Sequence, residues 1–229
     1  AAAVPRWQAV TAAARAAILE RAADRTEAQM SRLIGLIVRE AGKTAANAVG
    51  EVREAVDFLR YYAAQVRTDP PAAPLGPVVC ISPWNFPLAI PAGMVSAALV
   101  TGNPVLFKPS DRSPGLGTLL TDIFIEAGVP AGCLTCLPGG PEVGQTLIAH
   151  PQVVTIAFTG SKTVGLHILA EAARVGPGQP MVKRVIAEMG GKNAIIVDET
   201  ADLDEAIAGV VTSFSGYAGQ KCSACSRVI

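Results

Sequence analysis

Residues 77–111, PVVCISPWNFPLAIPAGMVSAALVTGNPVLFKPSD, contain the order of elements that decides the fold. Two short apolar runs, Val78–Ile81 and Pro104–Phe107, have the composition and length of buried strands. Between them, the apolar stretch Ala89–Val100 is long enough for a helix and is followed by the turn-forming pair Gly102 and Asn103. A strand, a helix and a strand in this order predict a parallel β-α-β unit.

The same alternation continues toward the C-terminus, and helices precede it. Apolar residues spaced by three and four predict helices from Arg15 to about Val66, with a break at Gly42 and a proline-rich connector after Asp69. We therefore predict an α/β fold, in which N-terminal helices precede a Rossmann-like, doubly wound parallel sheet. The remaining candidate strands are Leu134–Leu137, Val153–Phe158 and Ala194–Val197, and the remaining candidate helices are Gly115–Ala127, Val143–Ala149, Val164–Ala173 and Leu203 to about Ser213.

Size and charge limit the class of protein. With 229 residues, half of them apolar, the chain can bury a core of one domain or slightly more. The formal net charge is zero and the basic residues are dispersed, which argues against a nucleic-acid partner and favours a small neutral one. Five cysteines, an odd number in a chain of this size, are expected to be free thiols in a reducing cytoplasm.

A membrane span is not expected in the charge-free run of residues 70–107. Pro83, Pro87, Pro91 and Pro104 cut this run into pieces too short to cross a bilayer. No signal peptide is expected at the Ala-rich start either, because charged residues soon appear there within a helical pattern.

Two strand ends could hold a dinucleotide. The run Phe158–Ser161, followed by Gly165, closes an apolar strand and opens a helix, where Gly160 and Ser161 could cradle a pyrophosphate. The chain lacks the G-x-G-x-x-G fingerprint, however, and any strand-to-helix turn favours glycine and serine. Lys108 directly follows the candidate strand Pro104–Phe107 and could bind ribose hydroxyls. A solvated lysine at the end of a strand is equally compatible with the pattern.

The turn Ser82–Pro87 fixes an amide side chain directly after a candidate strand. Pro83 and Pro87 restrict the backbone around Asn85, and a rigid donor is what stabilisation of a developing oxyanion requires. The alternative is an asparagine that only forms the turn.

Cys222 is the candidate nucleophile. It lies in the run Gly219–Ser223 beside Lys221, and a nearby positive charge favours the thiolate that attacks carbonyl carbons. Cys222 and Cys225 form a C-x-x-C motif, so a redox disulfide remains an alternative. A zinc site with Cys133 and Cys136 is a further alternative, although the gap is far longer than in zinc ribbons, and we expect no metal.

Glu188 is the candidate base. It precedes two glycines, which could let its carboxylate approach and activate water, but a solvated strand-end glutamate fits the pattern too. A serine or metal hydrolase fits poorly, since His150 and His167 are the only histidines and neither lies in an H-E-x-x-H motif.

Five motifs occur in the order and with roughly the spacing seen in the aldehyde dehydrogenase superfamily, which this chain resembles over nearly its whole length. Residues 51–62, 74–90 and 219–227 are most similar to the Δ1-pyrroline-5-carboxylate (L-glutamate γ-semialdehyde) dehydrogenases, alone or within bifunctional proline-utilisation proteins. The motifs are Pro83–Pro87, Lys108–Asp111, Phe158–Ser161 with Gly165, Glu188–Lys192 and Gly219–Cys222.

The resemblance implies a role for each matching residue. Cys222 would be the nucleophile, Asn85 with the Cys222 backbone N–H the oxyanion hole, and Glu188 the base for deacylation. Asp111 stands where relatives commonly have Glu, which leaves the choice between NAD and NADP open. The cofactor would be held by Lys108 and Asp111 at the ribose, by Gly160 and Ser161 at the pyrophosphate, and by Ser82, Trp84, Ser110 and Gly165 around them.

The resemblance also implies a division of the chain. Residues 1–187 would hold the helices and the dinucleotide-binding domain, and residues 188–229 would begin an α/β catalytic domain. Family members normally continue well beyond the catalytic cysteine and form homo-oligomers, so these 229 residues alone are expected to be nearly inactive. Two alternatives to a glutamate-semialdehyde dehydrogenase stay open: a relative that oxidises another aldehyde, and a non-catalytic nucleotide-binding module.

Overall fold

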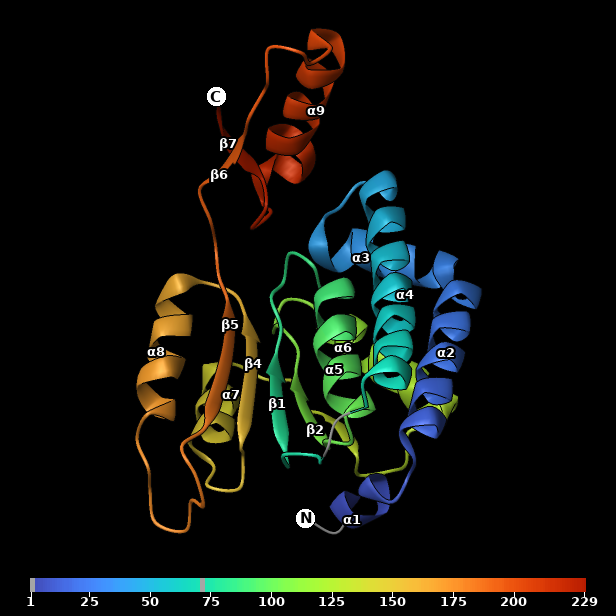
Figure 1. Ribbon diagram of the computed structural model, residues 1–229, viewed down its shortest axis with the longest axis vertical. Helices are drawn as coiled ribbons and strands as arrows, with labels where there is room; N and C mark the ends of the chain where they lie inside the picture. Colours follow the sequence, from blue (N-terminus) through green and yellow to red (C-terminus); the bar gives the residue numbers. More distant parts are fainter. Residues whose placement is uncertain (1–2, 71–72) are drawn as a thin grey trace.

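The structure is a computed structural model that describes residues 3–70 and 73–229, and its N-terminal part is helical (Figure 1). Thr11 and Thr44 accept hydrogen bonds from the N–H groups of Ala14 and Asn47 and so begin α2 and α4. Gly42 ends α3 with a left-handed φ of 66°, which confirms the predicted break. The helices of this part are α1 (Ala3–Gln8), α2 (Ala12–Ala28), α3 (Met30–Ala41) and α4 (Ala45–Thr68).

A parallel five-stranded sheet with the order β3-β2-β1-β4-β5 forms the centre of the molecule. Val79 in β1 is paired with Leu106 on one side and Ile156 on the other, so the chain switches direction across the sheet between β1 and β4. This order confirms the Rossmann-like, doubly wound prediction. The strands are β1 (Val78–Ile81), β2 (Val105–Lys108), β3 (Leu134–Cys136), β4 (Thr155–Thr159) and β5 (Arg184–Glu188).

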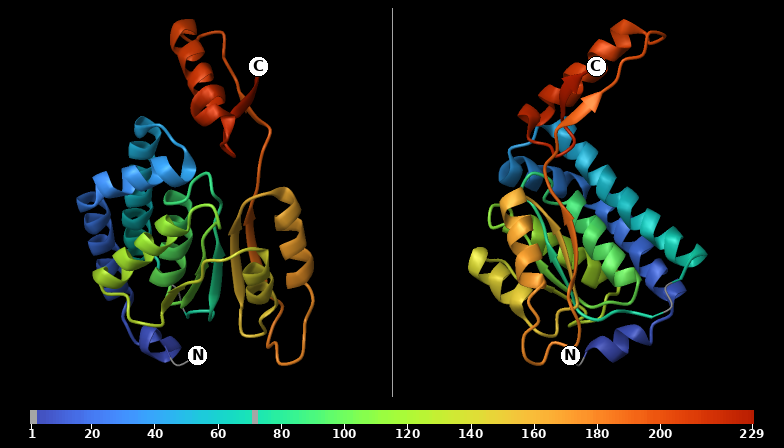
Figure 2. Two further views of the ribbon diagram at one scale, coloured as in Figure 1. Left: turned by 180° about the vertical axis from the view of Figure 1, so that it is seen from behind. Right: turned by 60° about the vertical axis from the view of Figure 1, so that its left-hand side comes forward.

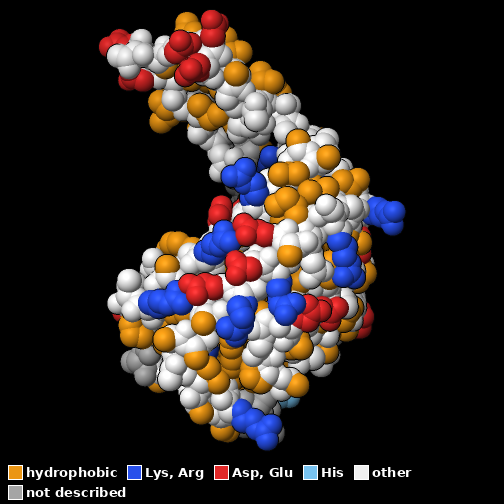
Figure 3. Space-filling model, turned by 90° about the vertical axis from the view of Figure 1, so that its right-hand side faces the viewer, with side chains coloured by type: hydrophobic (Ala, Val, Ile, Leu, Met, Phe, Trp, Pro, Cys, Tyr) orange, Lys and Arg blue, Asp and Glu red, His pale blue; other side chains and the backbone are white. Residues whose placement is uncertain are grey.

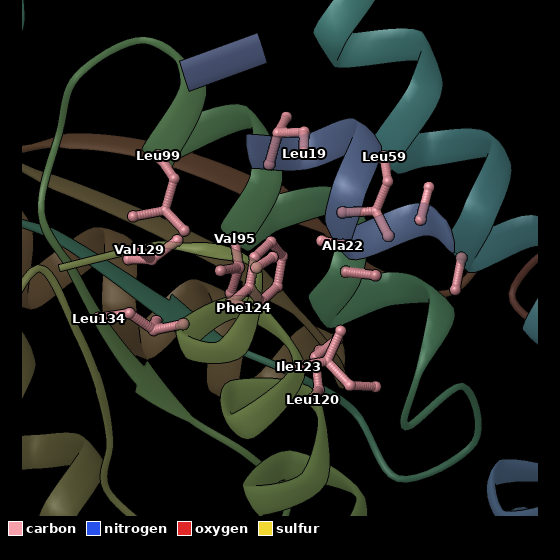
Figure 4. Packing of buried hydrophobic residues seen from close by; sticks show 14 of the residues in the cluster. Leu19, Ala22, Leu59, Val95, Leu99, Leu120, Ile123, Phe124, Val129 and Leu134 are labelled. Atoms are coloured by element: carbon pink, nitrogen blue, oxygen red, sulfur yellow. The ribbon is translucent and has the colours of Figure 1, made fainter. Parts of the chain in front are cut away.

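Helices cover both faces of this sheet. On one face, α5 and α6 pack with the N-terminal helices around a core that includes Leu19, Val95 and Phe124 (Figure 4). On the other face, α7 and α8 cover a smaller cluster that includes Ile156 and Phe158. None of the helices in residues 3–70 and 73–229 is long and apolar enough to cross a membrane. The covering helices are α5 (Ala89–Val100), α6 (Pro114–Ala127), α7 (Pro141–Ala149) and α8 (Lys162–Ala172).

One strand of the sheet was assigned wrongly from the sequence. The fifth strand is Arg184–Glu188, whereas Asn193–Ile195 pairs with Cys225–Val228 in a separate two-stranded sheet. β5 is an edge strand with one neighbour, and its Ile186 is 61% exposed, so its sequence lacks the continuous apolar run of a central parallel strand.

Residues 189–229 form a C-terminal unit that stands away from the rest of the molecule, here called the body (Figure 2). Asp202 caps α9, in which no residue is buried. The predicted boundary after residue 187 falls inside β5 and stays a prediction. On the face in Figure 3, charges of both signs are mixed over the body and acidic side chains gather at the tip of the unit. The unit contains β6 (Asn193–Ile195), α9 (Leu203–Ser215), the 3-10 helix Gly216–Gly219 and β7 (Cys225–Val228).

Candidate active site

The predicted site residues lie where strands end. In a parallel sheet all carboxyl ends meet at one edge, and ligands bind at that edge beside the point where the strand order reverses. β1 ends at Ile81 before the turn Ser82–Pro87, β2 ends at Lys108, and β4 ends at Thr159 before Gly160. Segments far apart in the sequence thus meet at this edge, next to the point between β1 and β4 where the strand order reverses.

A cleft of about 550 Å³ opens at this edge and brings most of the predicted residues together. The body supplies the walls that follow β1, β2 and β4, and the C-terminal unit supplies the wall that contains the exposed thiol of Cys222. Among the residues predicted from sequence, those that line the cleft are Ser82, Trp84, Asn85, Lys108, Ser110, Asp111, Gly160, Ser161 and Cys222.

Lys108 is buried in the floor of this cleft. Its Nζ donates a hydrogen bond to the backbone oxygen of Pro109 at 3.2 Å. Burial lowers the pKa of Lys108, while the carboxylates of Asp111 and Glu142 raise it in part. A buried ammonium group with a single backbone acceptor still has donors for ligand hydroxyls.

The turn after β4 is built for close approach. A Cβ added at Gly160 would lie 2.7 Å from the ring of Phe158. The backbone N–H of Gly160 donates a hydrogen bond to the backbone oxygen of Glu188 at 3.0 Å. The hydroxyl of Ser161 accepts from the N–H of Val164 and begins α8, and the N-terminus of this helix lies at the cleft because Ser161 and Val164 both line it.

Gly165 does not line the cleft. It is buried, and an added Cβ would lie 2.6 Å from the sulfur of Met189 and 3.2 Å from the ring of Phe158. Its observed role is to let α8 pack closely against the strand ends, as glycines do in nucleotide-binding folds.

An apolar slot of about 440 Å³ adjoins the cleft, with which it shares Lys108, Asp111 and Val164. Sequence reasoning missed this slot. The signal was the glycine-rich run of residues 139–144, which follows β3 in the same way as Gly160 follows β4. The other residues of the slot are Ile81, Gly140, Pro141, Glu142, Gly144, Gln145, Ile148, His167 and Ile168.

The Asn85 turn contacts the segment that contains Cys222. The Nδ2 of Asn85 donates to the oxygen of Gln220 at 2.9 Å. The rings of Trp84 and Tyr217 lie 6.2 Å apart, and the hydroxyl of Tyr217 donates to the oxygen of Ala41. The candidate oxyanion donor and the candidate nucleophile are therefore joined across the two parts of the molecule.

The backbone just before Cys222 is strained. Tyr217 and Ala218 have positive φ angles of 57° and 54°, which residues other than glycine rarely adopt. Gly219 follows with φ 71°, where glycine is the residue that fits without cost. Strain of this kind persists only where surrounding contacts impose it, and it is frequent at functional sites.

The two cysteines of the C-x-x-C motif have different surroundings. Cys222 is exposed, whereas Cys225 is buried in β7 and its thiol donates to the oxygen of Arg227 at 2.9 Å. Asn193 holds the loop between them, with Nδ2 donating to the oxygen of Cys222 at 2.7 Å. Both thiols are free, and the described part of the chain has no cluster of three or more potential metal ligands.

Glu188 lies next to the cleft but does not line it. Its side chain is exposed at the end of β5 and lines a third cavity, also of about 440 Å³, together with Phe58, Tyr62 and Met94. Thr159 lines both cavities, so the two adjoin. The structure thus does not bring the Glu188 carboxylate together with Cys222.

These features define a dinucleotide-binding fold whose ligand cleft contains an exposed cysteine, and comparison with known proteins assigns it to a family. The aldehyde dehydrogenase family matches residues 1–229, and the chain belongs to that family.

Particular relatives are similar in sequence. The bifunctional protein PutA of Rhizobium meliloti is 53% identical over 215 residues, which cover 93% of this chain and 17% of that protein. The 1-pyrroline-5-carboxylate dehydrogenase of Anoxybacillus flavithermus is 47% identical, with 97% of this chain and 46% of the relative covered. The chain thus spans about half the length of such dehydrogenases.

Solved structures agree with the fold. A Thermus 1-pyrroline-5-carboxylate dehydrogenase with bound NAD matches with a TM-score of 0.93 and 43% identity, covering 99% of this chain and 47% of that one. Proline utilization A of Bdellovibrio bacteriovorus matches with a TM-score of 0.93 and 47% identity, covering 99% and 25%. The aldehyde dehydrogenase fold prediction is therefore confirmed.

Proposed function

We propose that this chain is the cofactor-binding part of an NAD-dependent dehydrogenase that oxidises an aldehyde to a carboxylate through a covalent bond to Cys222. The observation that carries the proposal is the single cleft, in which an exposed thiol faces the carboxyl ends of β1, β2 and β4. A nucleophile next to a dinucleotide cleft is the arrangement that aldehyde oxidation requires.

The Cys222 thiolate adds to the aldehyde carbon and gives a hemithioacetal, whose oxyanion receives hydrogen bonds from Asn85 Nδ2 and the Cys222 N–H. A bound NAD would supply the hydride acceptor for oxidation of that carbon to a thioester. Water then releases the carboxylate from the thioester, with Glu188 as the base. Because the Glu188 carboxylate lines the adjoining cavity, this step requires its side chain to rotate toward Cys222.

The residues present fit a dinucleotide. Ser82 has a buried hydroxyl at the cleft wall with no hydrogen-bond partner in the described part of the chain, which a ligand oxygen would satisfy. Lys108 with Asp111 would hold the adenosine ribose, and the first turn of α8 at Ser161 would hold the pyrophosphate. The apolar slot beside Lys108 has the size and lining for the base.

The substrate we propose is L-glutamate γ-semialdehyde, which forms from 1-pyrroline-5-carboxylate and would be oxidised to L-glutamate. Support comes from the names of the similar proteins, among them 1-pyrroline-5-carboxylate dehydrogenases and PutA proteins. We also propose that the full-length protein acts in the cytoplasm as a homo-oligomer, and that its catalytic domain begins near residue 188.

The test uses the full-length protein with NAD and 1-pyrroline-5-carboxylate. Cys222→Ala should lower NADH formation at least about 10³-fold and leave NAD affinity nearly unchanged, because the thiol does the chemistry and the body binds the cofactor. Equal turnover by this variant would contradict the proposed nucleophile.

A panel of aldehydes, compared by kcat/KM, separates the proposed substrate from those of other family members. Retention on an NAD column without any NADH formed by the native thiol would instead indicate a non-catalytic nucleotide-binding module.

A further inference from the structure

A buried lysine lies beneath the active-site turn and has no part in the mechanism above. Lys43 is the middle one of the three residues between α3 and α4, with the left-handed Gly42 before it and the capping Thr44 after it. Its side chain is 1% exposed, and its Nζ lies 2.7 Å from a carboxylate oxygen of Glu51, whose side chain is fully buried. The connection that contains Lys43 lies at the end of the body that faces the C-terminal unit (Figure 1).

Glu51 reaches the helix that follows the Asn85 turn. Its Oε1 accepts hydrogen bonds from the N–H groups of Leu88 at 2.8 Å and Ala89 at 3.2 Å. No residue of α5 or its own cap position supplies a side-chain cap at this end. Glu51, which belongs to α4, therefore caps the N-terminus of α5. The residues that directly follow the Asn85 turn are held by this carboxylate.

Lys43 contacts both halves of the site. Its Nζ lies 3.6 Å from the ring centroid of Phe86, which is next to Asn85 in the turn. The same Nζ lies 5.0 Å from the ring centroid of Tyr217, in the strained segment before Cys222. An ammonium group attracts both aromatic faces, most strongly where water is excluded.

We propose that the Lys43–Glu51 pair is a positioning device that sets the Asn85 turn and the Cys222 segment at one separation. Glu51 fixes the turn through the first N–H groups of α5, and Lys43 joins the turn to the segment through Phe86 and Tyr217. A buried ion pair gives little net stability compared with apolar residues of similar size, so stability alone does not account for it. This inference rests on the proposed function for its kinetic consequence.

The experiment compares three variants of the full-length protein. Lys43→Met removes the cation and keeps the length of the side chain, and Lys43→Met with Glu51→Gln also avoids leaving a lone buried charge. Arg15→Met is the matched control, because Arg15 is also a buried cation and its Nε donates a hydrogen bond to the oxygen of Val100 at 2.8 Å, at the opposite end of α5.

Two readouts separate positioning from plain stability. The first is kcat per folded active site, with folded chains counted as those whose buried Cys80 resists alkylation, which removes the effect of unfolded protein. The second is hydrogen exchange at the backbone N–H groups of residues 216–224, which needs no activity. Both Lys43 variants should lose kcat on the order of 10²-fold and exchange faster in this segment, since small displacements of reacting groups cost that much. KM for NAD should change little.

The control should lower Tm without either effect. The inference is overturned if the Lys43 variants keep wild-type kcat per site and wild-type exchange, or if the double variant restores both, since the loss would then reflect a lone buried charge. If the wild-type protein forms no NADH, the proposed function fails, while the exchange measurement still decides whether Lys43 holds the segment.

Discussion

The body and the C-terminal unit differ most in how much of their apolar surface is covered. Phe107 and Phe124 in the body are at most 1% exposed. In the unit, α9 has no buried residue, and Phe214 is 50% and Ile207 61% exposed. The side of the cleft that contains Lys108 and Gly160 thus belongs to a packed core, whereas Cys222, the proposed nucleophile, belongs to a region with hardly any core of its own.

This difference makes the contacts between the two regions important for the site. Cys222 is placed relative to the body by the hydrogen bond from Asn85 to Gln220 and by the contacts of Tyr217 with Trp84 and Ala41. A few local contacts, and not an extensive packed interface, therefore determine the distance between Cys222 and the body side of the cleft.

The rate of thiol modification should differ between the two regions more than any other property. Cys222 is exposed, whereas Cys80 in β1 is fully buried, and burial raises the pKa of the Cys80 thiol to about 12. Iodoacetamide should modify Cys222 at least about 10³-fold faster than Cys80 under native conditions, because a core thiol reacts only after an opening that costs several kcal/mol. Peptide mass spectrometry measures both rates in one sample.

In Cys222→Ser the fast reaction should disappear and the rate at Cys80 should stay the same. Rapid modification of Cys80 in the native protein would contradict a packed body.

Truncation of aromatic side chains gives the next largest difference. Phe124→Ala should lower the free energy of unfolding of the body by about 3–5 kcal/mol, because it leaves a cavity in the core. Phe214→Ala, at a half-exposed position, should cost less than about 1 kcal/mol. Urea denaturation of the 229-residue chain measures both, and equal losses would mean that α9 is part of the same cooperative core.

Much of the fold could be predicted from the sequence because the central strands are buried on both faces. β1, β2 and β4 are nearly continuous apolar runs, so their positions and the intervening helices are clear. β5 has charged residues at both ends and one neighbour strand, and its place in the sheet is determined by pairing with Thr155–Thr159. Pairing between distant segments leaves no local pattern to read.

The site was predictable where a motif follows a strand, since the sheet then places it at the ligand edge. This holds for Asn85, Lys108 and Gly160. The side on which Glu188 projects depends on the register of β5, which the sequence did not reveal. Lys43 and Glu51 were missed because a charged pair inside a helical region looks like a solvated face until burial is known.

Alkaline conditions should weaken the body through Cys80. The unfolded thiol ionises near its ordinary pKa of 9.0, whereas the folded thiol stays neutral until about pH 12. As pH rises from about 9 toward 12, the unfolded state loses a proton that the folded state keeps, so stability falls with pH. Compared with Cys80→Ala, the wild-type chain should lose on the order of 2 kcal/mol between pH 8.5 and 10.5.

Val79→Ala is the matched control for this pH series, because Val79 is equally buried in β1 and carries no titratable group. Its difference from wild type should stay constant with pH. If the Cys80→Ala difference were constant as well, the Cys80 thiol would have to be open to solvent.

The smallest effect comes from two helical glycines that have open space around them. Gly50 in α4 and Gly209 in α9 are both exposed, and an added Cβ would meet no atom within 4 Å at either position. Alanine should stabilise each helix by about 0.5–1 kcal/mol, because it reduces the conformational freedom of the unfolded chain. Gly50→Ala should raise the free energy of unfolding of the body by this amount.

Gly209→Ala should leave that value unchanged and slow hydrogen exchange only within α9, because few buried contacts couple α9 to the body. An equal gain in global stability from both substitutions would show that the unit unfolds together with the body, and the distinction between the two regions would then fail.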